Sequence, residues 1–386
     1  MTTDEPRGDT RVIVAAIMLV TLVGIALSVS NPLLSLEMER WGTSSTLSGL
    51  TATAAGFGTV LAVPLVPRFA LAMGVPFVLA GALAISAIGM ALFYLVPNVL
   101  AWAALRFALG CGIGIIFTLA EFWINAAAAP KQRGLVMGLY ATALYAGFAV
   151  GPALLTLIGT SGALPYLATA GLMALGLVPL ALVGRSAPTL EQPASGSVAH
   201  FVFLVPSATF GALIFGAVET GVIMLLPVHN VRLGYPEQEA TLLLSAFTLG
   251  NVAFQLPIGL LSDRMNRRTL LLVLSSLSAL LAMTLPFGPP GFWAFAGLLF
   301  LLGGISGAIY TVGLAHLGAR FSGTDLASAN AAFVLLYSVG LMVGPPTIGY
   351  GMDKAGALGM PVALAMLMAL YAGLVLTRML KSARQR

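Results

Sequence analysis

Three charged side chains lie well inside long apolar segments of this 386-residue chain, away from the segment ends: Arg106, Glu121 and Glu219. A charge at the centre of a membrane-spanning helix costs about 2.5–3.5 kcal/mol on insertion scales, so it is usually paired or has a function. A carboxyl group in such a place can bind and release a proton, and an arginine can pair with a carboxylate. These residue types therefore predict proton handling or ion pairing within a membrane.

The composition explains why the surrounding segments belong in a membrane. Apolar residues make up 59% of the chain, charged residues only 8%, and the mean hydropathy is +1.00. A soluble domain carries about 25% charged residues, because its surface faces water. A spanning helix needs about 20 apolar residues. Twelve segments meet this length: 12–35, 46–67, 75–96, 99–124, 134–159, 163–183, 201–227, 240–261, 269–287, 291–316, 326–351 and 359–379.

The two halves of the chain repeat at an offset of 193 residues. The matched pairs include Gly114 with Gly307, Gly147 with Gly340, Gly151 with Gly344, Pro152 with Pro345 and Pro64 with Pro257. Such duplication places a site between two halves in many transporters. The stretch 184–200 is rich in Ser, Pro and Gly and falls at the midpoint. We therefore expect an all-α membrane protein of two pseudo-symmetric six-helix bundles, 1–183 and 201–386, joined by a linker at 184–200.

Basic residues indicate the orientation. With both termini in the cytoplasm, only Arg40, Arg232 and Lys354 of the 18 Lys and Arg residues fall outside, while 14 fall inside and Arg106 lies within a span. Cytoplasmic loops carry an excess of Lys and Arg, so this asymmetry predicts cytoplasmic termini and a cytoplasmic linker. The net charge of +5 thus reports topology, and we expect no nucleic-acid partner.

One loop carries residues suited to gating. Gly259 is followed by Asp263 and Arg264 and then by Arg267 and Arg268, between the eighth and ninth apolar segments. A carboxylate at a helix end can cap the N-terminus of a neighbouring helix, and arginines can reach carboxylates and lipid phosphates. The alternative is a positively charged cytoplasmic loop with no further role.

The corresponding loop of the first half, 63–76, departs from this pattern. By the repeat offset, Ala70 stands where Asp263 stands in the second half. A latch built on an aspartate is therefore missing there, or is rebuilt with Arg68.

Several of these stretches resemble the major facilitator superfamily. The loop from Gly259 to Arg268 is similar to the family's loop signature, with Asn266 in place of the later Gly. The stretch from Leu105 to Gly112 is similar to its embedded-arginine motif, with Leu109 replacing the usual Gln. Glu121–Asn125 and the residues after it resemble the YcaD-like bacterial branch. The resemblance implies a multi-pass protein of the bacterial inner membrane that works by alternating access.

The fifth apolar segment resembles a motif of proton-driven exporters. Its Gly138, Gly147, Gly151 and Pro152 have the spacing of that motif, although Leu154 and Leu155 replace the Gly-Gly that normally follows. Small residues four apart let helices approach closely, and Gly-Pro bends a helix. Gly147, Gly151 and Pro152 are therefore either gating residues or plain packing residues.

The resemblance also suggests partners for the embedded charges. In this family spans 1, 4, 7 and 10 surround the cavity, which implies that Arg106 and Glu219, at similar depths, face each other. They either pair or find separate partners. Glu121 either forms a salt bridge with Arg68 that closes the cytoplasmic side, or carries a proton or substrate.

Uncharged residues add further candidates. Asn31, Tyr310 and Gln255 are polar residues within spans and candidates for the cavity, although hydrogen bonds between helices explain most such residues. His229 and His316 lie near span ends, where we expect water, either as ordinary interfacial residues or as proton carriers.

We expect a proton-coupled exporter of amphiphilic or hydrophobic small molecules, acting as a monomer with no cofactor besides the proton gradient. The chain's 16 Met and 20 Phe suit varied apolar ligands. The alternative is proton-coupled uptake of a small polar metabolite such as a sugar or an organic acid. A membrane enzyme is a remote alternative, because no metal-binding or acid–base motif stands out.

Overall fold

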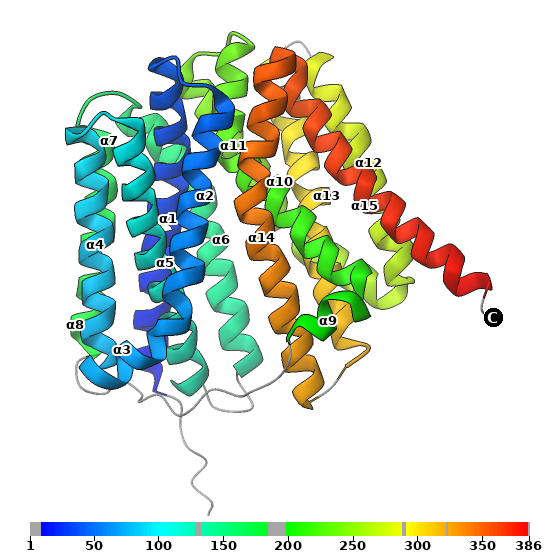
Figure 1. The fold of residues 1–386 in the computed structure, drawn as a ribbon, viewed down its shortest axis with the longest axis horizontal. Helices are drawn as coiled ribbons and strands as arrows, with labels where there is room; N and C mark the ends of the chain where they lie inside the picture. The colour runs from blue at the N-terminus through cyan, green and yellow to red at the C-terminus, as the bar shows by residue number, and fades with distance from the viewer. Residues whose placement is uncertain (1–8, 128–132, 184–197, 288–290, 322, 385–386) are drawn as a thin grey trace, which may run out of the picture. The chain divides into compact units, whose positions relative to one another are not determined.

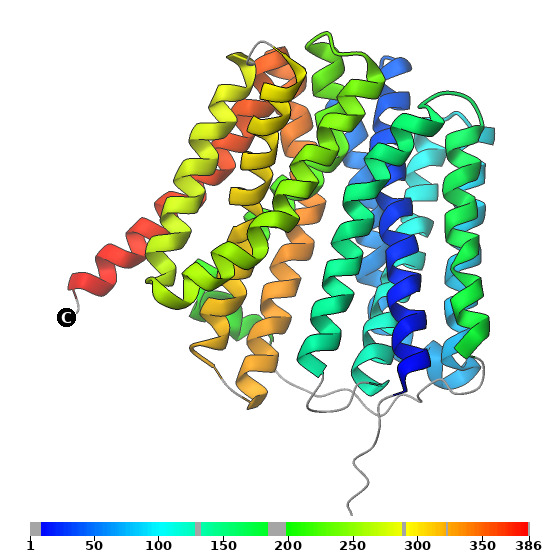
Figure 2. The ribbon, with the colours of Figure 1, turned by 180° about the vertical axis from the view of Figure 1, so that it is seen from behind.

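The computed structural model describes residues 9–127, 133–183, 198–287, 291–321 and 323–384. These residues form helices joined by short turns, and no strand occurs among them (Figures 1 and 2). The chain divides into two compact units, one of residues 1–33 and 54–193 and the other of residues 34–53 and 194–386. We call them unit 1 and unit 2.

Unit 1 is a bundle of apolar helices. Its elements are α1 (Thr10–Arg40) as far as Leu33, α2 (Ser45–Ala62) from Ala54, η1 (Val63–Leu65), α3 (Val66–Met73), α4 (Val75–Leu95), α5 (Val99–Ala127), α6 (Arg133–Ile158), α7 (Leu164–Leu175) and α8 (Leu177–Val183). Buried aliphatic side chains of α1, α4 and α5 form its core with Trp123. Gly74, at φ +84°, turns the chain between α3 and α4, in a conformation that favours glycine.

Unit 2 contains the C-terminal end of α1 and the first half of α2 as well as the later helices. The later elements are α9 (Val198–Leu204), α10 (Pro206–Arg232), α11 (Glu237–Arg264), α12 (Arg267–Thr284), η3 (Leu285–Phe287), α13 (Phe292–Gly318), α14 (Gly323–Ala355), η4 (Gly356–Leu358) and α15 (Gly359–Arg384). Residues 34–53, from the end of α1 to the middle of α2, pack with these helices.

The described helices confirm the predicted fold class. Each of the twelve predicted apolar segments is helical, and ten stretches of the described chain are long and apolar enough to cross a membrane. The second segment is built of α2, η1 and α3, and the sixth of α7 and α8, which the hydropathy pattern does not separate. Most of the predicted 184–200 linker lies outside the described residues, and residues 198–200 begin α9. The division into halves at this linker stays a prediction.

The sequence repeat reappears in the packing within each unit. In unit 1, Gly58 meets the Phe107 carbonyl and Gly110 the Ala55 carbonyl; in unit 2, Gly250 meets the Phe300 carbonyl and Gly303 the Phe247 carbonyl. A Cβ atom at any of these glycines would collide with backbone, so only glycine allows the two helices to approach so closely. The α2–α5 contact and the α11–α13 contact are thus two copies of one packing arrangement.

Candidate functional site

Glu219 is a buried acid whose side chain is held by a tyrosine. It lies on α10 with 8% of its surface exposed, and the Tyr337 hydroxyl of α14 donates a hydrogen bond to its Oε2 at 2.7 Å. Glycines bring the two helices together, since Gly216 lies against the Tyr337 carbonyl and Gly340 against the Leu213 carbonyl. A buried carboxylate needs such a donor, because burial without a partner is costly.

Aromatic rings pack around the tyrosine that holds this acid. Phe215, on the same helix as Glu219, stacks on Tyr337 at a centroid distance of 5.9 Å and lies 5.3 Å from Tyr310 of α13. Tyr310 also packs edge-on against Phe333 at 4.9 Å and Tyr337 at 5.5 Å. The structure therefore brings together two predicted site residues, Glu219 and Tyr310, on different helices of unit 2. We call Phe215, Glu219, Tyr310, Phe333 and Tyr337 the acid–aromatic cluster.

The predicted residue Gln255 belongs to a second polar group in unit 2. Thr311 of α13 donates a hydrogen bond to Gln255 Oε1, and Gln255 Nε2 donates to Asn251 Oδ1 at 2.8 Å. Gly307 of α13 lies against the Asn251 side chain, so the absence of a Cβ makes room for this amide. Thr311 stands out in the sequence only through its repeat partner Thr118.

The remaining embedded charges lie in unit 1. Arg106 is on α5 with 2% of its surface exposed, and Asn31 is half-buried on α1. Glu121, near the C-terminal end of α5, accepts a hydrogen bond of 3.2 Å from the Tyr140 hydroxyl of α6. This tyrosine is a partner that sequence reasoning missed. The pairing of Arg106 with Glu219 and that of Glu121 with Arg68 stay predictions.

Gly147, Gly151 and Pro152 all lie on α6, where the two glycines face α1. Gly147 lies against the Thr21 carbonyl, and its own carbonyl accepts a hydrogen bond of 3.3 Å from Ser28 Oγ. Gly151 packs directly on Ser28, one turn further along. These glycines therefore pack α6 tightly on α1, and their role in gating stays a prediction.

The loop between α11 and α12 is organised by local contacts. Asp263, in the last turn of α11, accepts a hydrogen bond of 3.2 Å from Arg267 Nη2 and is 69% exposed. Asn266 caps α12 by accepting from the backbone N–H groups of Arg268 at 3.0 Å and Thr269 at 3.4 Å. The residue that replaces the family's glycine is thus the N-cap of a helix. A cap by Asp263 on the N-terminus of a neighbouring helix stays a prediction.

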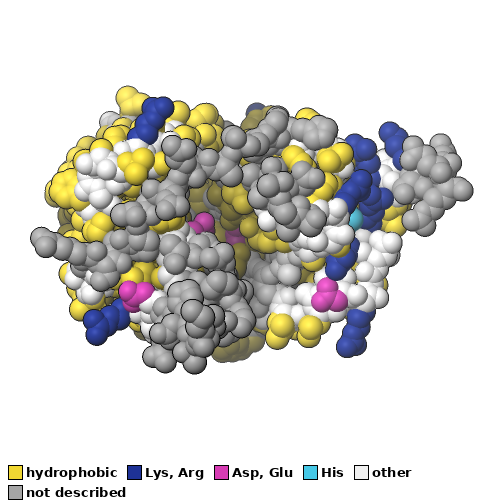
Figure 3. Space-filling model, turned by 90° about the horizontal axis from the view of Figure 1, so that it is seen from below, with side chains coloured by type: hydrophobic (Ala, Val, Ile, Leu, Met, Phe, Trp, Pro, Cys, Tyr) yellow, Lys and Arg dark blue, Asp and Glu magenta, His cyan; other side chains and the backbone are white. Residues whose placement is uncertain are grey.

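Positive charge gathers beside this loop. Arg264 ends α11, where a cation suits the helix dipole. Arg267, Arg268 and Arg320 all act electrostatically on His316. Figure 3 shows Lys and Arg side chains grouped around a histidine on this face. Arg68, the cation of the corresponding loop in the first half, lies on α3 in unit 1 and is exposed.

At the other end of unit 2 the structure shows ion pairs formed by arginines whose charges, in the sequence, indicate only the topology. Arg40, the last residue of α1, donates to both carboxylate oxygens of Glu237 at the start of α11, with Nε to Oε1 at 3.1 Å. Arg40 Nη1 also donates to Glu37 at 2.6 Å. Two helix ends are thus joined by a bidentate pair, the geometry in which Arg binds carboxylates best.

A second bidentate pair joins Arg232 to Glu39. Arg232 Nε and Nη2, at the end of α10, each donate to a Glu39 carboxylate oxygen at 2.7 Å. Nη2 also donates to Ser45 Oγ at 2.9 Å. The first residue of α2 is thereby tied to the same arginine.

Asp353 completes this arrangement by capping α2. One of its oxygens accepts from the Ser45 N–H at 2.8 Å, and the other accepts from the Thr46 N–H at 2.7 Å and from the Thr46 hydroxyl. A carboxylate at a helix N-terminus is favoured by both the free N–H groups and the helix dipole. We call these residues, Glu37, Glu39, Arg40, Ser45, Thr46, Arg232, Glu237 and Asp353, the clamp.

The expected water-accessible position of His229 is wrong. Its side chain, on α10 one turn from Arg232, is fully buried. Both ring nitrogens lack a hydrogen-bond partner among the described residues. The helix α10 packs against α11, α13 and α14, and a hydropathy pattern does not reveal such packing.

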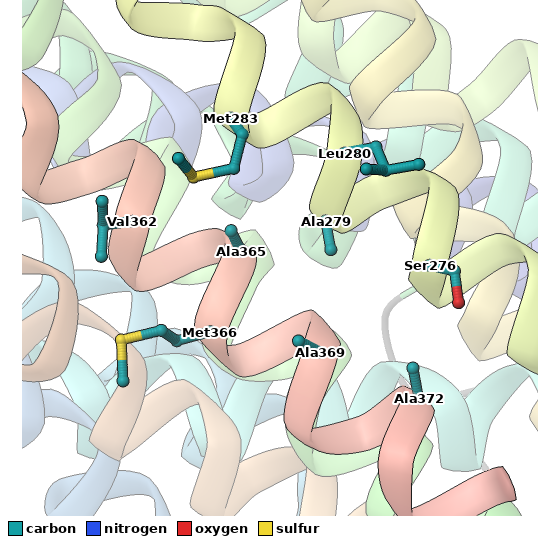
Figure 4. Close-up of a pocket in the computed structure, with 9 residues that line it drawn as sticks. All are labelled: Ser276, Ala279, Leu280, Met283, Val362, Ala365, Met366, Ala369 and Ala372. Atoms are coloured by element: carbon teal, nitrogen blue, oxygen red, sulfur yellow. The ribbon is translucent and has the colours of Figure 1, made fainter.

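An apolar groove lies between α12 and α15. It has a volume of about 550 Å³, and alanines and methionines from both helices line it together with Ser276, Leu280 and Val362 (Figure 4). Its lining carries no charge and one hydroxyl, so it offers dispersion contacts to apolar chains. Among the described residues, no group of three or more His, Cys, Asp or Glu side chains could hold a metal ion.

Comparisons with known proteins agree with this geometry. The family model for the Major Facilitator Superfamily matches residues 16–237 and 208–385. The MFS-type transporter YfkF of Bacillus subtilis is 26% identical over 345 residues, which cover 87% of this chain and 88% of YfkF. The MFS-type transporter YcaD of Escherichia fergusonii is 26% identical over 254 residues, 63% of each chain. The names of both relatives state that they are transporters of this superfamily and give no substrate.

Solved structures share the fold at low sequence identity. The nucleoside transporter NupG matches with a TM-score of 0.77 and 16% identity, over 94% of this chain and 98% of that one. A bacterial homologue of the human lysosomal transporter Spinster, in an inward-facing conformation, matches with a TM-score of 0.74 and 16% identity, over 95% and 94%. A D-xylose–proton symporter matches with a TM-score of 0.72 and 17% identity, over 95% and 96%.

Proposed function

Because this chain belongs to the major facilitator superfamily, we propose that it is a proton-coupled exporter of amphiphilic or hydrophobic small molecules. The observation that supports this most is the acid–aromatic cluster of unit 2. It combines one buried carboxyl group with four aromatic rings. An aromatic surface binds flat or apolar groups, and a carboxyl group beside it can bind either a proton or a cationic substrate.

In this proposal, Glu219 is the proton carrier. When it is ionised, the Tyr337 hydroxyl stabilises the carboxylate through a charge-assisted hydrogen bond. When it takes up a proton, the negative charge that holds a cation is gone, and the substrate leaves the cluster. One site thus binds proton and substrate in turn, which is the simplest basis for exchange.

Arg106 has a supporting role in the proposal. If alternating access brings this buried arginine of unit 1 next to Glu219, it favours the ionised carboxyl and therefore proton release. If the two residues separate, proton uptake is favoured instead. The conformational change then controls the protonation of Glu219.

The clamp fits the same cycle. Its arginines, Arg40 and Arg232, lie at the end of the spans that the distribution of basic residues predicts to be external. It ties the C-terminal end of α1 and the start of α2 to α10, α11 and α14 through ion pairs and one helix cap. We propose that these contacts break when the transporter opens to the outside.

A second candidate function is uptake of a small polar metabolite. The Thr311–Gln255–Asn251 row favours it, because amides and hydroxyls recognise hydroxyl-rich ligands. Proteins with the same fold include a nucleoside transporter and a xylose–proton symporter. In this candidate Glu219 keeps its proton-carrying role, and the substrate binds the polar row.

Transport in proteoliposomes with an imposed pH gradient separates the two functions. Tetraphenylphosphonium serves as the amphiphilic probe, and xylose and uridine serve as the polar probes. We expect tetraphenylphosphonium movement coupled to proton counterflow, abolished by Glu219→Gln and retained by Glu239→Gln, a change at an exposed acid of α11. Coupled movement of xylose or uridine alone would favour uptake. Normal gradient-driven transport by Glu219→Gln would contradict the role of Glu219.

A further inference from the structure

His229 is a buried titratable residue that neither proposed function uses. Its ring is fully buried on α10, and both nitrogens lack hydrogen-bond partners among the described residues. Buried polar atoms are nearly always paired, and those that are not mark a place for water, an ion or a functional proton. Histidine is the side chain whose charge ordinarily changes near neutral pH. This ring is therefore placed to bind a proton.

Other unpaired polar atoms lie within one helical turn of the clamp. Arg232 at the end of α10 donates to Ser45 at the start of α2, so these two helix ends meet. His229 precedes Arg232 by three residues and Ser48 follows Ser45 by three, each about 4.5 Å along its own helix. The Ser48 hydroxyl is also buried and unpartnered among the described residues, as is the neighbouring Asn230 Oδ1. Buried polar atoms without partners among the described residues therefore lie within one turn of the clamp on both α2 and α10.

The charges around His229 decide what a proton there would do. Arg232, one turn away on the same helix, acts on the ring directly. Glu39 of α1 is paired with Arg232, and Asp353 of α14 also acts on that arginine. Glu237 of α11 is paired with Arg40 at the same end of the unit. An imidazolium ion would therefore meet one cation directly, while the nearby acids already have partners.

We propose that His229 is a proton sensor of the clamp: proton uptake by its imidazole repels Arg232, competes for Glu39 and releases residues 34–53 from the rest of unit 2. The step is a simple protonation: a hydronium ion from the external solution gives its proton to the imidazole, which becomes imidazolium, and a water molecule remains. Low external pH would then favour opening at the clamp. The inference does not depend on the substrate or on the coupling role of Glu219.

The test follows the distance between α2 and the end of α14. Leu47 is 41% exposed on α2, and Leu358 is 50% exposed in η4, so cysteines there can carry spin labels without disturbing the packing. The native Cys111 is replaced by Ser. Double electron–electron resonance on the full chain in proteoliposomes compares the distribution of distances between the two labels at pH 8 and at pH 5.5. We expect the population with the longer distance to rise several-fold at pH 5.5.

Two histidine variants identify the sensor. His229→Gln and His229→Asn should both remove the pH response, and using both guards against a folding defect in one of them. His316→Gln is the matched control, since His316 lies at the opposite end of its span in the same unit and should leave the response unchanged. A full pH response in either folded His229 variant, or no response in the parent protein, would overturn the proposal.

Glu219→Gln separates this inference from the proposed function. We expect that variant to keep the pH-dependent distance change while losing proton-driven transport. If Glu219→Gln abolished the distance change and the His229 variants kept it, the sensor would be Glu219 and the inference would be wrong. Absence of proton-coupled transport in the parent protein would contradict the proposed function and leave the sensor standing.

Discussion

Glu39 and Arg232 form a bidentate ion pair, and they stand 193 residues apart in the chain. This separation equals the offset at which the two halves of the sequence repeat, as in Gly147 and Gly340. Each residue is therefore the counterpart of the other, one at the end of the first span and one at the end of the seventh. The duplicated position has become an acid in one copy and a base in the other, so the two copies attract.

Charge reversal tests this relationship. Glu39→Arg and Arg232→Glu should each release the clamp by placing like charges together, and the double variant Glu39→Arg/Arg232→Glu should restore it. A partly exposed pair contributes about 0.2–1 kcal/mol, so removing it should change the open-to-closed ratio up to about fivefold. The spin-label distance between positions 47 and 358 measures this ratio. No recovery in the double variant would show that the pair is incidental.

Asp353→Asn tests the cap on α2. The change keeps the shape of the side chain but removes the charge that faces the N–H groups of Ser45 and Thr46. Loss of an N-cap interaction typically costs about 0.5–2 kcal/mol, so we expect a lower melting temperature in detergent. Lys354→Gln, at the next residue, is the control and should melt like the parent protein. Equal melting of Asp353→Asn and the parent would mean that the cap contributes no stability.

The sequence predicts the helices of this protein well, because a membrane span requires a long apolar run and little else. It places Glu219 and Tyr310 near each other only through the family resemblance, and it gives Tyr337 no special role, since nothing in the pattern pairs a tyrosine with an acid 118 residues away. Close approach of α10 and α14 at Gly216 and Gly340 creates that contact. Backbone packing of this kind depends on three-dimensional register.

The clamp could not be predicted from the sequence, for a different reason. Arg40 and Arg232 fit the topology as external charges, and an external charge needs no partner because water solvates it. Their acids, Glu39 and Glu237, are equally ordinary at span ends. Only the packing of residues 34–53 against the later helices of unit 2 brings these charges together.

Two glycines of α13 offer a matched test of the repeated packing. At Gly303 a Cβ would strike the Phe247 carbonyl, so Gly303→Ala should push α11 away and destabilise unit 2 by about 1–3 kcal/mol. At Gly297 nothing lies within 4 Å of the added atom, so Gly297→Ala should stabilise the helix by about 0.5–1 kcal/mol. Thermal unfolding of both variants measures the difference. Similar melting temperatures would show that the α11–α13 contact tolerates separation.

Tyr337→Phe isolates the hydroxyl that holds Glu219. The ring and its stacking on Phe215 and Tyr310 remain, but the 2.7 Å hydrogen bond to the carboxylate is lost. A hydrogen bond to a charged group contributes about 1.5–3 kcal/mol, so the ionised form of Glu219 becomes harder to reach by about tenfold or more. We therefore expect slower proton-driven transport of tetraphenylphosphonium, because proton release from Glu219 is hindered. In the absence of a gradient, the affinity for the substrate should stay within about threefold of the parent's, since the ring and its aromatic surface are unchanged.

Flux measurements in proteoliposomes together with equilibrium binding separate the two effects. Tyr145→Phe, on α6 of unit 1, is the control for loss of a tyrosine hydroxyl elsewhere. Unchanged coupled flux in Tyr337→Phe would mean that the hydroxyl only fills space, and weakened binding with normal coupling would place Tyr337 in substrate recognition instead.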